Sequence, residues 1–161
     1  MQRSVIYKAL RDRAKEKLTW VQYIDLQKGQ FNHPADNYPI PLPALLFEFA
    51  HLETSNQLST LQTTELIIRI SLCLQCVTDS FDTSITEIET IELLDKWDEI
   101  FNTYHGFYCE NITRLTRIRE LPADYNNGLI ILASEYSTVV KESVDKATVR
   151  IAKPTITIEK L

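Results

Sequence analysis

The stretch ELIIRISLCLQCV, from Glu65 to Val77, decides the fold of this chain. Every second residue in it is apolar: Leu66, Ile68, Ile70, Leu72, Leu74 and Cys76. The residues between them include the charge of Arg69 and the amide of Gln75. Apolar residues at a period of two place one face of a β-strand against a core and leave the other face open. The stretch therefore predicts a long strand with one buried face and one partly polar face.

Two segments have the apolar spacing of amphipathic helices. Apolar residues recur at helical spacing over 2–18, where most of the other positions are basic or polar. The second helix is predicted over 85–104, where Ser84 and Glu87 fit a capping box and acidic residues crowd the first turns. Gly106 is the expected stop of this helix.

The remaining apolar segments are shorter and predict strands. They span 20–27, 44–50, 113–120 and 129–140, and Asn127-Gly128 is a hairpin turn signal before the last of them. The polar segment His51–Thr63 is interpreted as a long exposed connection. The fold class is α+β, a mostly antiparallel sheet with two main helices packed on one face. Residues 1–145 are expected to form a single domain, and 146–161 a β-rich C-terminal tail or arm.

Composition narrows the function classes. The 161 residues carry 17 Lys and Arg against 22 Asp and Glu, so the net charge is −5, which gives no overall attraction to nucleic acid or to an anionic membrane. We find neither a signal peptide pattern nor a membrane-spanning stretch, and the three cysteines favour a reducing, cytoplasmic setting with free thiols. Three glycines are too few for most phosphate-binding loops.

No group of residues matches an enzyme signature or a cofactor site. Cys73 and Cys76 spell C-x-x-C, but inside a strand they point to opposite faces, so buried free thiols are favoured over a metal site. The three histidines are far apart, and no G-x-S-x-G elbow is present. The carboxylates of the second helix are interpreted as a solvated face. An aromatic cluster facing the core is expected from Phe101, Tyr104, Phe107 and Tyr108.

The order of segments resembles the tail terminator and head–tail joining (minor tail) proteins of long-tailed bacteriophages and prophages. A basic first helix and a strand are followed by a Pro-rich approach to PALLFEF at 43–49, the long alternating strand Thr64–Val77 and the helix Ile85–Tyr104. A strand around RLTR at 114–117 and the segment DYNNGLII at 124–131 complete the pattern. The resemblance covers roughly residues 1–140, and the tail from Ala147 onward departs from it.

The resemblance implies a structural protein of the virion, present in the host cytoplasm during assembly, with no enzymatic activity and no cofactor. Such proteins form a ring, usually a hexamer, at the head-proximal end of the tail tube. The implied partners are further copies of the chain, the tail tube protein and a head completion or connector protein, with no membrane and no specific nucleic acid. Candidate subunit interface residues are Arg69, Gln75, Arg114, Arg117 and Arg119.

Two alternatives remain open from the sequence. One is another head–tail connector or tail-tube component on a related fold. The other is an enzyme or a small nucleic-acid-binding module, for which the basic first helix and the arginines of 114–119 are the motivating residues.

Overall fold

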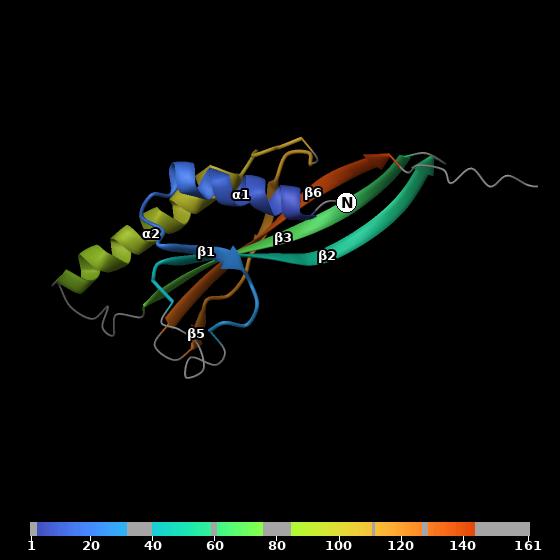
Figure 1. The fold of residues 1–161 in the computed structure, drawn as a ribbon. Helices are drawn as coiled ribbons and strands as arrows, with labels where there is room; N and C mark the ends of the chain where they lie inside the picture. The colour runs from blue at the N-terminus through green and yellow to red at the C-terminus, as the bar shows by residue number, and fades with distance from the viewer. Residues whose placement is uncertain are drawn as a thin grey trace, which may run out of the picture.

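The described part of the chain forms two helices and a six-stranded sheet (Figure 1). The computed structural model describes residues 3–31, 40–58, 61–75, 85–110, 112–126 and 129–143. The helices are α1 (Arg3–Lys17) and α2 (Ile85–Tyr104), as the apolar spacing predicts within a residue or two. The strands are β1 (Tyr23–Leu26), β2 (Ala44–Leu58), β3 (Leu61–Gln75), β4 (Thr116–Glu120), β5 (Asp124–Asn126) and β6 (Leu129–Ser143).

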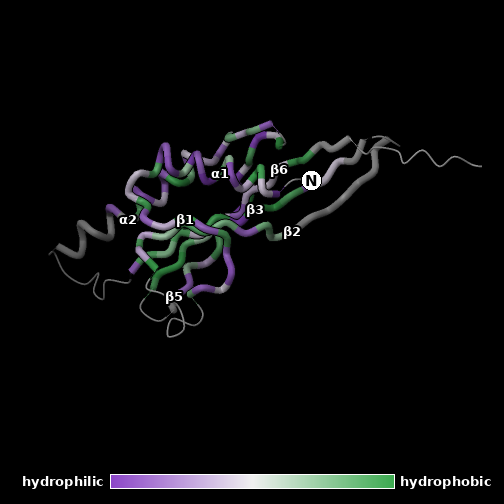
Figure 2. The backbone as a smooth tube through the Cα atoms, in the orientation of Figure 1, coloured by the Kyte–Doolittle hydropathy of each residue, from purple (hydrophilic) through white to green (hydrophobic). Residues whose placement is uncertain are grey.

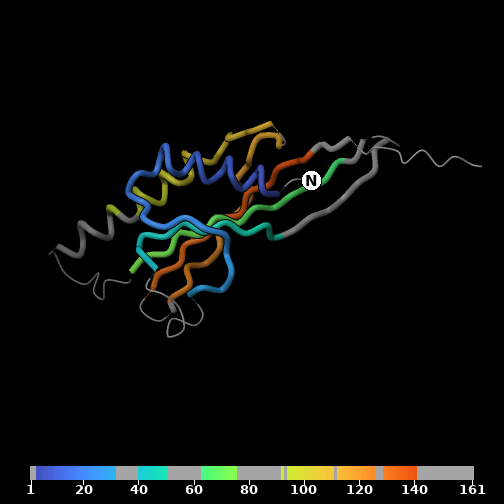
Figure 3. Tube along the Cα trace, viewed as in Figure 1, coloured from blue at the N-terminus to red at the C-terminus, as the bar shows by residue number. Residues whose placement is uncertain are grey.

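The strands follow the order β1-β2-β3-β6-β4, and β5 pairs with the beginning of β6. β1 runs parallel to β2, whereas the other pairings are antiparallel, so the sheet is mixed and the fold class is α+β. In Figure 3 the segments 23–26 and 44–47 lie side by side. The predicted C-terminal arm at 146–161 lies outside the described residues.

Three long strands form the centre of the sheet. β2, β3 and β6 have 15 residues each, a length of about 50 Å at the usual rise per residue. The predicted connection over 51–63 is wrong, because β2 continues to Leu58 and pairs there with the start of β3. Backbone pairing with β3 maintains the outer half of β2 although the sequence there is polar. The segment 124–126, for which no strand was predicted, forms the short strand β5.

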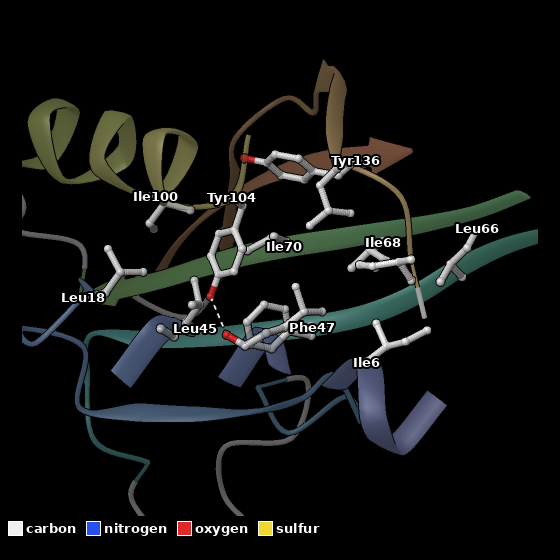
Figure 4. Close-up of a cluster of buried hydrophobic side chains, with 14 of the residues drawn as sticks. Ile6, Leu18, Leu45, Phe47, Leu66, Ile68, Ile70, Ile100, Tyr104 and Tyr136 are labelled. Carbon is white, nitrogen blue, oxygen red and sulfur yellow. Dashed lines mark hydrogen bonds between the residues drawn. The ribbon is translucent and has the colours of Figure 1, made fainter. Parts of the chain in front are cut away.

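The hydrophobic core lies against one face of the sheet, which we call the core face. Leu45 and Phe47 of β2 meet Ile68 and Ile70 of β3 there, and Tyr136 of β6 joins them (Figure 4). Both helices contribute to the same cluster, with Ile6, Leu10, Ala14, Ile100 and Tyr104. In Figure 2 the strands are largely hydrophobic in the middle of the sheet, whereas α1 is largely hydrophilic.

The end of α2 is fixed to α1 by a buried tyrosine. The Tyr104 hydroxyl donates a hydrogen bond of 3.1 Å to the Leu10 carbonyl, and its ring meets Phe47 edge to face (Figure 4). Gly106 follows with a φ of 78°, the left-handed conformation of a helix stop. The predicted aromatic cluster is only partly formed, because Tyr108 is exposed.

The opposite face of the sheet, which we call the second face, carries the other alternate residues. Near the start of β2 it is covered by a small apolar cluster in which Phe31 packs on Ala44, Leu46 and Cys73. Further along the strands this face carries the charges of Glu48, Arg69 and Glu135. The candidate site lies in this charged part of the second face.

Candidate interface across the sheet

A row of four charges crosses the second face, one on each of four neighbouring strands. Glu48 of β2 pairs in register with Arg69 of β3, and Arg69 pairs with Glu135 of β6. Arg119 of β4 pairs with Glu135 from the other side. We call Glu48, Arg69, Glu135 and Arg119 the charge row. Its signs alternate along its whole length, which is the favourable arrangement for cross-strand neighbours.

Arg69 joins the two carboxylates on either side of it. Its Nη1 lies 3.0 Å from Glu48 Oε2, and its Nη2 lies 2.9 Å from Glu135 Oε1. The alternation of β3 places Arg69 between Ile68 and Ile70, whose side chains enter the core on the opposite face. A rigid, buried strand therefore positions this guanidinium.

Glu135 is the most enclosed member of the charge row. Its side chain is 3% exposed, and Arg119 Nε lies 2.6 Å from its Oε2. The hydrogen bond from Arg119 holds the pKa of Glu135 below its ordinary value; the hydrogen bond from Arg69 acts the same way, and burial opposes both. Glu135 is therefore a carboxylate at neutral pH, with an arginine on each side.

The structure separates the five residues predicted for the interface. Arg69 and Arg119 belong to the charge row. Arg117 pairs with Glu120 and lies with its guanidinium carbon 3.8 Å from the centre of the Phe101 ring, so it is held against α2. Arg114 is exposed ahead of β4, and Gln75 is exposed at the end of β3.

The sequence reasoning missed the two acidic members, Glu48 and Glu135. A signal for Glu48 was present, since it is a single carboxylate between Phe47 and Phe49 in an apolar strand. A charge in such a place needs a countercharge on a neighbouring strand. Which arginine supplies it depends on the pairing register, which the local sequence does not contain.

The described residues show little that resembles a chemical site. Within the described ranges no group of three His, Cys, Asp or Glu side chains is placed to hold a metal ion. Burial raises the pKa of the Cys73 thiol to about 12, so this thiol is protonated and unreactive at neutral pH. Cys76, its C-x-x-C partner, lies outside the described residues.

A small hollow of about 310 Å³ lies beside the end of α2 and is lined in part by Arg13, His105 and Tyr108. The Arg13 guanidinium is already engaged there, because its Nε donates to the Thr103 carbonyl and the group lies over the Phe107 ring. The hollow therefore offers little unused binding capacity.

Comparisons with known proteins give no family for this chain. No protein-family model matches it, and no curated protein sequence is significantly similar to it. Neither helix, over the part of the chain that the structure describes, is long and apolar enough to cross a membrane.

Proposed function

We propose that this chain is a structural virion assembly protein, a tail terminator of a long-tailed bacteriophage or prophage. In this role its copies form a ring, usually of six, at the head-proximal end of the tail tube and present a surface to the head connector. The proposal rests on the resemblance of the segment order. The observed order of helices and strands from Arg3 to Ser143 is compatible with it.

The structural observation that supports the proposal most is that, among the described residues, the sheet has an unpaired edge on each side. β1 pairs with β2 over Ala44–Phe47, and within the described residues no strand continues this pairing from Glu48 to Leu58. On the other side β4 is the last strand of the described sheet. Two different open edges allow copies to join head to tail, and such contacts make a ring when the rotation between copies closes.

The nucleic-acid alternative is less favoured by the site. Arg117 and Arg119, which motivated it, are paired with Glu120 and Glu135. The carboxylates beside these arginines offset the positive charge that attracts a phosphate backbone. The net charge of −5 also disfavours binding to nucleic acid.

The test has two parts. Light scattering over a wide concentration range, with negative-stain microscopy, is expected to find rings with a mass near six times 18.6 kDa. Deleting the gene from the phage or prophage that carries it is expected to give headless tails of uncontrolled length. Normal virions after deletion would overturn the proposal, and growth of the purified chain into long tubes would favour a tail-tube component instead.

A further inference from the structure

The charge row ends at the two edges of the sheet that the described residues form, and its ends have opposite charge. Glu48 lies on β2 just past Phe47, the last residue that β1 pairs with, and Arg119 lies on β4. Glu48 is 40% exposed and Arg119 is 63% exposed, whereas Glu135 between them is enclosed. Arg69 and Glu135, the two inner members of the charge row, each have a countercharge on both sides. Within the described residues, the two end charges have one only on the side of the sheet interior.

The strand directions suit a continuation of the sheet from one copy to the next. β2 is antiparallel to β3, β3 to β6 and β6 to β4, so β2 and β4 run in opposite directions. If a second copy continues the sheet in the same orientation, its β2 lies antiparallel to β4 of the first. In the register that continues the charge row, Arg119 of the first copy lies level with Glu48 of the next copy.

We infer that a second copy of this chain binds at this edge: β4 of one copy pairs with β2 of the next, and Arg119 binds Glu48 of that copy. The charge row then continues across the contact with its signs alternating. Joining two copies through the same edge would instead bring Arg119 against Arg119, or Glu48 against Glu48, and like charges at a contact are unfavourable. The inference rests on the proposed function, since it names the contact through which the ring would close.

The test uses charge reversal at each end of the charge row. Arg119→Glu and Glu48→Arg are made separately in the full chain, and their association is measured by light scattering and sedimentation at several concentrations. Each variant alone is expected to need at least about tenfold more protein than wild type for half-maximal assembly, because two like charges meet at every contact. An equal mixture of the two is expected to regain assembly, because the carboxylate introduced at position 119 faces the guanidinium introduced at position 48.

Controls separate the contact from folding. Each reversal also places a like charge beside Arg69 or Glu135 within its own chain, so circular dichroism and thermal unfolding are recorded for every variant. Arg119→Gln and Glu48→Gln remove the charge without repulsion and are expected to weaken assembly less. Lys15→Glu changes an exposed charge on α1, outside both edge strands, and is expected to assemble as wild type.

The outcomes distinguish this inference from the proposed function. Rings that form equally well in folded Arg119→Glu and Glu48→Arg would overturn the contact and leave the ring proposal standing. Two defective variants that do not rescue each other would also overturn it. A wild-type chain that stays monomeric at every concentration would overturn the contact, and the deletion phenotype would then decide the proposed function by itself.

Discussion

At the scale of single residues, Glu135 is the carboxylate of the charge row that binds two arginines. It is a buried carboxylate held between Arg69 and Arg119. Glu135→Gln keeps the size of the side chain but removes the charge that both guanidiniums bind. We expect the free energy of unfolding at pH 7 to fall by about 1–3 kcal/mol, the usual cost of losing hydrogen bonds to a charged group. Glu120→Gln, at an exposed pair with Arg117, is the control and should change it by less than about 0.5 kcal/mol.

The same residue predicts a pH dependence. The pKa of Glu135 in the folded chain is lower than its ordinary value of 4.5. The stabilisation from its charge is therefore complete above that value and is lost as the pH falls through the folded pKa. Urea unfolding at pH 7 and at several lower pH values should show the gap between wild type and Glu135→Gln closing in acid. A gap of constant size would contradict this origin of the stability.

The cysteines give a second prediction at this scale. Cys73 is fully buried with a raised pKa, whereas Cys109 is partly exposed. Since the thiolate is the reactive form, iodoacetamide at pH 8 should modify Cys109 in the folded chain long before Cys73, and both should react in urea. Mass spectrometry of the digested protein measures this directly. Rapid labelling of Cys73 under native conditions would contradict the buried position given to β3.

At the scale of elements, the hydrogen bond between the end of α2 and α1 can be measured. Tyr104→Phe removes the hydroxyl that donates to the Leu10 carbonyl and leaves the ring in place. We expect a loss of about 1 kcal/mol in the free energy of unfolding, the net value of one hydrogen bond. Tyr136→Phe is the matched control, because Tyr136 is equally buried and no described residue is seen to hydrogen-bond its hydroxyl. Equal losses in the two variants would mean that the hydrogen bond between the helices adds nothing to the free energy of unfolding.

The elements also show what the sequence could predict. Strict alternation from Leu66 to Leu74 identified β3, and the apolar spacing identified α2, because each has one strongly apolar face. The outer half of β2, from His51 to Leu58, has no such face. It is a strand because its backbone pairs with β3, and a polar sequence contains no sign of that partner. The parallel pairing of β1 with β2 was not predicted either, because neither segment contains a sign of its pairing partner.

At the scale of the whole molecule, the charge row is a product of register. Residues 48, 69, 119 and 135 come from four segments, and their alignment requires three correct strand pairings. A shift of one residue in any pairing would move a charge to the core face. The sequence could therefore nominate Arg69 and Arg119 as polar candidates, but only the fold could show that they share Glu135 and that the row ends at both edges.

This arrangement predicts where assembly protects the backbone. β3 is paired on both sides within one chain, so its amides should exchange at the same slow rate in single copies and in assemblies. β4 and the part of β2 that begins at Glu48 each have one open side in the described sheet. If copies join through these edges, alternate amides in 116–120 and near residue 48 gain hydrogen bonds on assembly. Their exchange should then slow by about tenfold or more, since tenfold corresponds to only about 1.4 kcal/mol.

Hydrogen exchange read by mass spectrometry can compare the assembled wild type with the monomeric Arg119→Glu variant, and Lys15→Glu assemblies serve as the reference for an unrelated change of charge. Protection that appears on both edges together, with β3 unchanged, is the pattern of a head-to-tail contact. In such a contact each copy pairs its β4 with one neighbour and its β2 with the other. Protection of only one edge would indicate that two copies pair symmetrically, each through the same edge. Such a contact is completed by two copies, so it could not by itself build a ring of six.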